Sequence, residues 1–200
     1  MSSSSILFWL ACAVVLFWAV GAYNRLVRLR TGVRKAFSVL DEQLLRQVVW
    51  VQACLPESMR GAATVSQIAQ DEAQAAWARL SAASEQFAVA LAQVRAHPID
   101  GTATASLAMA HDAMVTAWEG ALRDAVGPGD GEASAERLQT RWVTLLHQTL
   151  PLQDALNTAV QAYNHAISQF PAMLLAWLFG FRPAGLIGRL ASAHVHDAMD

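Results

Sequence analysis

The chain has 200 residues, 14 Lys and Arg against 16 Asp and Glu, and a formal net charge of −2. Its hydrophobic fraction of 54% exceeds the roughly 45–50% of ordinary soluble domains, and its length suffices for one domain with a buried core. Five of the bases lie within residues 25–35, so nine bases face 16 acids elsewhere, a net charge of about −7. This balance argues against a nucleic-acid-binding surface. With cysteine only at positions 12 and 54, an internal disulfide is excluded unless these two meet.

A short amino-terminal tail, residues 1–5, precedes 17 residues without a strongly polar side chain, Ile6 to Ala22. At about 1.5 Å per residue this run nearly crosses a hydrocarbon layer of about 30 Å. Tyr23 follows at the position of the membrane interface, where tyrosine is favoured. The pattern predicts a transmembrane helix over residues 6–22.

Two alternatives to a membrane span remain open. A signal peptide cleaved after Gly21 or Ala22 fits the small residues Ala19 and Gly21, but the leading MSSSS lacks a basic region. A lipoprotein signal ending at Cys12 fits less well, since Trp9 and few apolar residues precede it. Cleavage of a signal peptide would give an exported helical domain.

Charge asymmetry predicts the orientation of the span. Nothing positive except the α-amino group precedes it, whereas a basic run follows before any acid: Arg25, Arg28, Arg30, Arg34 and Lys35. The positive-inside bias places the amino terminus outside and the rest in the cytoplasm, a single-pass protein of the cell (inner) membrane. We expect the five bases to face anionic lipid headgroups.

Residues 23–171 are predicted to form a helical bundle. Apolar residues recur at steps of three and four, as in a bundle helix: Val33, Phe37, Leu40, Leu44, Val48, Val51 and Leu55. A break or a kink is expected at Pro56, breaks at residues 98–101 and 127–131, a kink at Pro151 and a bend at Phe170–Pro171. Thr102 or Thr104 would cap the helix that follows residues 98–101. Four helices with short connections predict an all-α fold, an up-and-down antiparallel four-helix bundle.

The carboxyl-terminal part divides into residues 172–190 and a flexible tail, residues 191–200. The stretch MLLAWLFGF, residues 173–181, is too short to span a bilayer and too apolar to remain in water. It is expected to lie on the membrane surface, to cap the bundle, or to occupy the groove of a partner.

Both tyrosines of the chain occur in the same sequence, Ala-Tyr-Asn, at Tyr23–Asn24 and Tyr163–Asn164. Asn157 precedes Asn164 by seven residues, two turns along one helix face. We expect these asparagines at the rim of the bundle, bonding a neighbouring helix and fixing its register. Both Tyr-Asn pairs should lie at the membrane-proximal end.

The second pair belongs to a longer motif that resembles the signature of the LemA family. The motif is carried by Leu156, Asn157, Val160, Tyr163, Asn164, Ile167, Phe170 and Pro171, with Phe181 in the apolar segment after it. Tyr23–Asn24 and Leu40-Asp41-x-Gln43-Leu44 resemble the first helix of that family. Leu156 stands in place of a tyrosine, as in a divergent member. The resemblance implies a membrane-anchored four-helix bundle of no established enzymatic activity, with relatives that accompany membrane peptidases or envelope proteins.

The sequence contains no catalytic signature. Glu-x-x-His, Cys-x-x-Cys and Gly-x-Ser-x-Gly are all missing, and no histidine has a matching nucleophile and orienting acid. We therefore expect no enzyme, no cofactor and no metal, and no nucleic-acid partner. The leading hypothesis is a scaffold or adaptor for membrane or envelope proteins; the alternative is a peripheral lipid-binding module using the basic run and residues 173–190.

Overall fold

The computed structural model describes residues 3–55, 72–98, 100–125, 132–170 and 172–188. These ranges contain five helices and no strand, so the predicted all-α class is confirmed. The helices are α1 (Ser3–Cys54), α2 (Glu72–Ala96), α3 (Gly101–Ala125), α4 (Glu132–Ser168) and α5 (Ala172–Leu178). The expected breaks at Pro56, 127–131 and Pro171, and the tail 191–200, lie outside the described residues.

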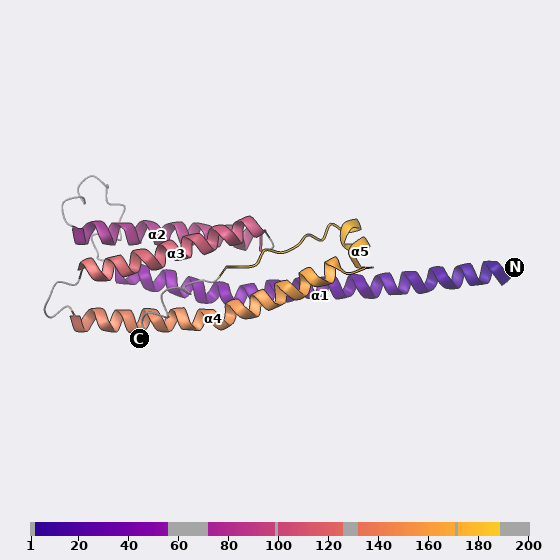
Figure 1. Ribbon diagram of the computed structural model, residues 1–200, viewed down its shortest axis with the longest axis horizontal. Coiled ribbons are helices and arrows are strands. Elements are labelled where there is room, and N and C mark those ends of the chain that lie inside the picture. The colour runs from indigo at the N-terminus through magenta and orange to yellow at the C-terminus, as the bar shows by residue number, and fades with distance from the viewer. Residues whose placement is uncertain (1–2, 56–71, 99, 126–131, 171, 189–200) are drawn as a thin grey trace.

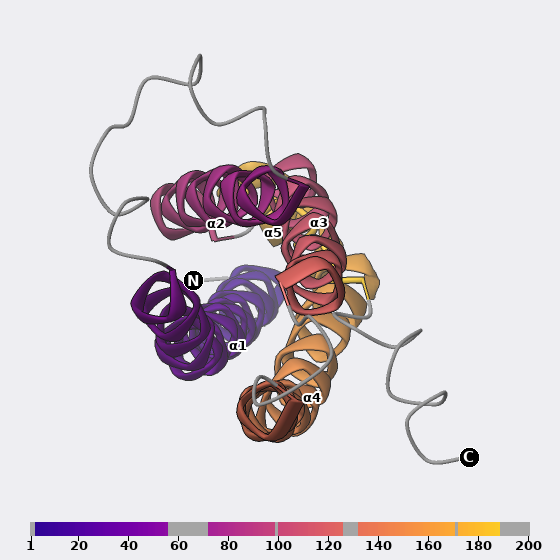
Figure 2. The ribbon, with the colours of Figure 1, turned by 90° about the vertical axis from the view of Figure 1, so that its left-hand side faces the viewer.

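Two pairs of helices build the domain. α1 lies along α4, and α2 lies along α3, with the amino-terminal part of α1 projecting far beyond the others (Figure 1). Viewed end on, the four long helices surround one core to which each contributes apolar side chains (Figure 2). α5 is set apart beside the point where α1 leaves the domain (Figure 1).

α1 has two parts with opposite surroundings. From Leu26 onward the predicted apolar seam is buried, including Val33, Leu40 and Leu44, because α4 and α2 cover it. Before that point its large apolar side chains are exposed, among them Phe17 and Trp18. The large apolar side chains on the seam of this one continuous helix therefore change from exposed to buried within a few residues of Tyr23.

The exposed part of α1 has the length and composition of a membrane span. Among the described residues it is the one helix that qualifies, with a mean hydropathy of 2.2 over a window of which 0% is buried. A signal sequence near an amino terminus shares these properties. One long apolar helix is thus present where the sequence predicts it.

The amino-terminal end of α3 is capped by Asp100 and not by a threonine. Asp100 accepts hydrogen bonds from the amide of Thr102 at 3.0 Å and from its hydroxyl at 2.8 Å. These two bonds hold the pKa of the Asp100 carboxyl below its usual value. The expected cap by Thr102 or Thr104 is wrong, because a carboxylate before the first turn satisfies the free amide directly.

A buried polar layer joins three helices in the middle of the core. Gln47 of α1 donates to the Thr149 hydroxyl of α4 at 2.7 Å, and His111 Nε2 of α3 lies 2.9 Å from Gln47 Oε1. Since an amide oxygen only accepts, His111 Nε2 carries the proton and Nδ1 is bare. His111 Nδ1 is buried and has no hydrogen-bond partner in the part of the chain that the structure describes, and the ring packs edge-on against Phe87, with 5.2 Å between the ring centroids.

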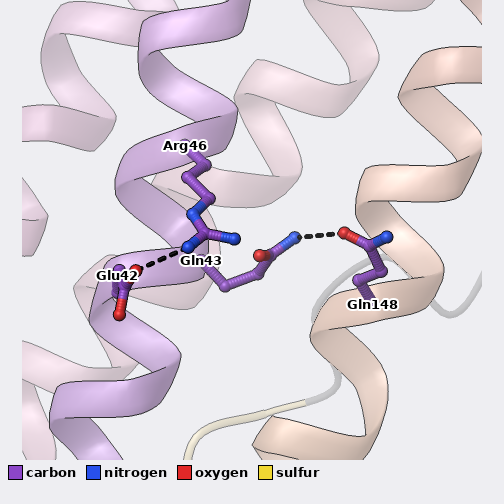
Figure 3. A network of polar contacts seen from close by, with 4 residues as sticks. All are labelled: Glu42, Gln43, Arg46 and Gln148. Carbon is purple, nitrogen blue, oxygen red and sulfur yellow. Dashed lines mark hydrogen bonds and ion pairs between the residues drawn. The ribbon is translucent and has the colours of Figure 1, made fainter.

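One turn earlier, Gln43 repeats this bridge between α1 and α4. Its amide donates to Gln148 Oε1 at 3.2 Å, as Figure 3 shows, and to the Leu145 carbonyl at 3.4 Å. The neighbouring Glu42–Arg46 ion pair lies on the exposed face of α1 and contributes little. Gln43 and Gln47 thus fix α1 against α4 shortly before Pro151, which lies inside α4 as expected.

The buried histidine makes a prediction about acid stability. Burial lowers the pKa of His111 from 6.5 to about 4, so the unfolded chain binds a proton before the folded one does as the pH falls. The stability that His111 contributes is complete above pH 6.5 and is lost between pH 6.5 and 4, by up to about 3 kcal/mol.

His111→Gln keeps a donor for Gln47 but does not titrate in this range. We expect its free energy of unfolding, from denaturant titrations of the full chain in detergent micelles, to fall less between pH 7 and pH 4 than that of the wild type. An equal fall in the free energy of unfolding of the two proteins would contradict the assignment of this pH dependence to His111.

Candidate functional site

The candidate site is built around the chain that follows α5. α5 ends in a turn in which Phe181 N–H donates to the Ala176 carbonyl at 2.8 Å and Gly180 N–H to the Trp177 carbonyl at 3.4 Å. Gly180 adopts a positive φ of 68°, the left-handed conformation that glycine allows at a helix end. This turn sends residues 181–188, here called the return segment, back along the domain (Figure 1).

Two asparagines of α4 hold the return segment by paired hydrogen bonds. Asn164 donates to the Ala184 carbonyl and accepts from the Ala184 amide, both at 2.8 Å. Asn157 makes the same pair with Ile187, at 3.0 and 3.1 Å. Each side-chain amide thus takes the place of the peptide group of a neighbouring strand.

The spacing of the two pairs explains why they coexist. Seven residues of a helix rise about 10.5 Å, and three residues of extended chain cover about 9–10 Å. Asn157 and Asn164 therefore meet Ile187 and Ala184 without strain in either element. If residues 181–188 were helical, their backbone N–H and C=O groups would bond within that helix and could not pair with the asparagine side chains of α4.

Two further side chains of α4 bind the ends of the return segment. The buried Tyr163 donates from its hydroxyl to the Arg182 carbonyl at 2.9 Å, and Gln153 donates to the Gly188 carbonyl at 2.6 Å. Burial raises the pKa of Tyr163, with the charge of Arg30 acting in the opposite direction. The phenol therefore stays protonated and able to donate at neutral pH.

The other side of the return segment packs against α3. A Cβ added to Gly185 would lie 2.4 Å from the Gly101 Cα and 2.6 Å from the Thr104 hydroxyl, so no side chain fits there. A Cβ on Gly188 would lie 3.9 Å from the Ala108 Cβ, an ordinary contact. The return segment is therefore inserted between α3 and α4, with Ala184 and Ile187 buried.

The first Tyr-Asn pair behaves differently from the second. The Tyr23 ring packs against Phe179 at 4.9 Å and Phe181 at 6.0 Å, while Asn24 is exposed and forms no hydrogen bond within the described residues. The expectation that the asparagines bond a neighbouring helix is wrong for Asn157 and Asn164. A helix offers its backbone groups to itself, whereas the extended return segment leaves them free to pair.

The remaining predicted residues divide by burial. Leu156 and Ile167 belong to the core, Phe170 is 77% exposed, and Pro171 lies outside the described residues. Four of the five bases of the basic run after Ala22 are exposed: Arg25, Arg28, Arg34 and Lys35. Arg30 is half-buried, with its guanidinium 5.8 Å from the centre of the Phe181 ring.

A basic cavity of about 430 Å³ opens beside the return segment. It lies between α1, the α2–α3 connection, α4 and the return segment, and its polar lining comprises Arg30, Arg34, His97, Asp100, Tyr163 and Arg182. The sequence indicates Arg30 and Arg34 only as headgroup contacts. Their proximity to Arg182 and His97 cannot be predicted from spacing, because these two residues come from other parts of the chain.

A second, mainly apolar cavity of about 400 Å³ lies where α1 enters the domain. Trp18 and Ala22 of α1 face Ala166 and Ala172 across it. Around it the large side chains of α5 and its flanks are exposed, and Trp177 is 84% exposed. Only Ala176 of α5 is buried, so this helix covers the bundle with one small side chain rather than with its apolar bulk.

No group of three or more His, Cys, Asp or Glu side chains placed to hold a metal occurs in the described ranges. Comparison with protein-family models, with curated proteins and with solved structures finds no match.

The paired asparagine bonds predict a difference between the two Tyr-Asn pairs. Asn164→Ala removes two hydrogen bonds and should lower the free energy of unfolding by about 1–3 kcal/mol. It should also abolish the hydrogen-exchange protection of the Ala184 amide. Asn24→Ala is the control and should change neither quantity by a comparable amount. Equal effects of the two substitutions would argue against the paired bonds.

The two glycines of the return segment give an independent prediction. Gly185→Ala places a methyl group against the backbone of α3 and should destabilise the protein by about 1–3 kcal/mol. Gly188→Ala adds the same methyl group where it fits and should stay within about 0.5 kcal/mol of the wild type. Urea titrations of the full chain in detergent micelles measure both values, and tolerance of Gly185→Ala would contradict the packing.

Proposed function

We propose that this chain is a non-enzymatic, single-pass protein of the cell (inner) membrane whose helices form an up-and-down antiparallel four-helix bundle on the cytoplasmic side. In this proposal the bundle serves as a scaffold or adaptor for other membrane or envelope proteins. The observation that carries it is the position of α5, whose large apolar side chains are exposed beside the end of the apolar part of α1. The motif resemblance to the LemA family supports the same proposal.

The exposure of α5 favours the membrane surface over capping of the bundle. Exposed apolar side chains on α5 and its flanks are Phe170, Met173, Leu174, Trp177, Leu178 and Phe179. A contiguous apolar surface of this kind is unfavourable in water. Beside a membrane span it enters the interfacial layer, where tryptophan and phenylalanine are favoured.

The contact between Tyr23 and Phe179 ties α5 to the end of the span. Because Phe181 packs edge-on against the same ring, the return segment and α5 share one fixed point on α1. The apolar cavity at this level, lined by Trp18 and Ala22, suits the end of a lipid acyl chain. These features support membrane contact at this end and leave the opposite end of the bundle for protein partners.

The basic run supports the cytoplasmic orientation. Arg25, Arg28 and Lys35 are exposed within 13 residues of Ala22, with no acidic residue before Asp41. Such a run remains on the cytoplasmic side during insertion and is attracted to anionic headgroups. If the chain were instead cleaved after Gly21 or Ala22 and exported, intact-mass measurement would detect the shortened amino terminus.

The position of α5 at the bilayer gives a direct test. A single cysteine, with Cys12 and Cys54 changed to serine, carries an environment-sensitive fluorophore at position 177 or, as the control, at the exposed Thr144 of α4. In full-length protein in liposomes, spin-labelled lipids should quench the label at position 177 several-fold more strongly than the label at position 144. Equal quenching would exclude surface contact by α5.

The scaffold role requires a partner on a defined face. A photocrosslinking residue at exposed positions of α2 and α3, introduced one at a time in native membranes, should capture the same protein from neighbouring positions and not from α5. Absence of any position-dependent product across growth conditions would leave the peripheral lipid-binding module as the better account.

A further inference from the structure

Arg30 occupies a position in α1 where the sequence pattern demands an apolar residue. It lies four residues after Leu26 and three before Val33, both buried on the same seam. Its Nε is buried and has no hydrogen-bond partner among the described residues. Burial of this N–H costs desolvation that the Phe181 ring, 5.8 Å from the guanidinium, offsets only in part and that an anion would offset further.

The other charges around Arg30 share its sign. Arg34 and Arg182 line the same cavity, and neither they nor Arg30 lies within ion-pair distance of a carboxylate in the described residues. The one acid in the lining, Asp100, is occupied by its two hydrogen bonds to Thr102. Three guanidinium groups from two distant parts of the chain therefore converge opposite this single carboxylate, and the lining keeps a net positive charge.

The backbone adds to this positive field. α3, a helix of 25 residues, begins at Gly101 in the wall of the cavity, and the amino-terminal end of a helix carries a partial positive charge, which the Asp100 cap offsets in part. Tyr163, His97 and the Gly180 backbone complete the wall. The cavity volume of about 430 Å³ is at the small end of the roughly 300–1,000 Å³ of ligand sites.

We propose that this cavity binds a phosphate group through Arg30, Arg34 and Arg182. Planar guanidinium groups match the oxygens of phosphate in paired hydrogen bonds, and three of them suit a dianionic monoester better than a single carboxylate. The unsatisfied Nε of Arg30 gains a partner in this complex. The return segment supplies Arg182, so binding also stabilises the position of that segment.

Two sources of the phosphate group fit the geometry. Arg30 follows Ala22 by eight residues, about 12 Å along the helix axis, beyond a headgroup layer of about 5–8 Å on each side of the bilayer, but its side chain leans back towards the amino terminus and so towards that layer. A lipid headgroup with a terminal phosphate monoester reaches this level, and so does a soluble phosphate monoester. The lipid source depends on the proposed membrane anchoring, whereas the soluble source does not.

The test uses the full chain in nanodiscs and separates the two sources. In one arm, nanodiscs with phosphatidic acid, which has a phosphate monoester, are compared with phosphatidylglycerol, which has the same sign of charge but only a diester. In the other arm, nanodiscs of zwitterionic lipid are titrated with inorganic phosphate against chloride at equal ionic strength. The readout is the ligand-dependent rise in unfolding temperature.

Matched variants distinguish binding in the cavity from a general attraction of anions to the basic surface. Arg34→Gln with Arg182→Gln removes two charges from the cavity, and Arg28→Gln with Lys35→Gln removes two exposed charges outside it. We expect the first pair to weaken the apparent affinity at least about tenfold and the second less than about twofold. Arg30→Met, which keeps an unbranched apolar stem in the seam, should abolish saturation while the protein remains folded.

A rise with phosphatidic acid alone assigns the lipid source, and a rise with inorganic phosphate assigns the soluble source. An equal loss of apparent affinity in the two double variants overturns the proposal. So does the absence, in both arms, of a saturable rise in unfolding temperature. Trp177→Ser weakens bilayer contact without touching the cavity lining, so failure of the membrane proposal and failure of this one give different results.

Discussion

The paired hydrogen bonds between α4 and the return segment are the interaction on which the end of the domain beside the apolar part of α1 depends. The return segment has no regular secondary structure to satisfy its backbone groups, and at Ala184 and Ile187 it is buried between α3 and α4. Asn157 and Asn164 supply both the donor and the acceptor at two places two helical turns apart. With these pairs in place, Ala184 and Ile187 become part of the core.

The position of the return segment determines what surrounds the end of the apolar part of α1. Its beginning carries Phe181 onto Tyr23 and Arg30, and its carbonyl at Arg182 accepts from Tyr163. α5 is thereby held beside the end of the apolar part of α1, and Arg182 is held beside the basic run. One set of bonds thus positions both the exposed apolar helix and the basic cavity.

Helix-forming periodicity accounts for what the sequence predicts well. The steps of three and four from Val33 to Leu55 identify the buried face of α1 because tertiary packing follows that stripe. The apolar run before Tyr23 is equally legible, since its composition differs from the rest of the chain. The all-α class follows from these two patterns alone.

The site was less accessible to sequence reasoning because its contacts are non-local. The rim position of Asn164 was a reasonable expectation, but a partner of extended chain 20 residues later leaves no helical pattern to detect. Gly185 and Gly188, three residues apart beside Ala184 and Ile187, are the signal that could have indicated a close extended segment. The Asp100 cap and the buried His111 layer likewise depend on which helices meet, which periodicity does not specify.

The central claim is that the asparagine side chains of α4 pair with the backbone of the return segment. Nuclear magnetic resonance of the full chain in nanodiscs, with side-chain amides labelled, tests it most directly. The account predicts slowly exchanging side-chain amide protons for Asn157 and Asn164, with through-space contacts to the Ile187 and Ala184 backbone respectively. Rapid exchange of both amides with solvent, and no contact to residues 181–188, would contradict it.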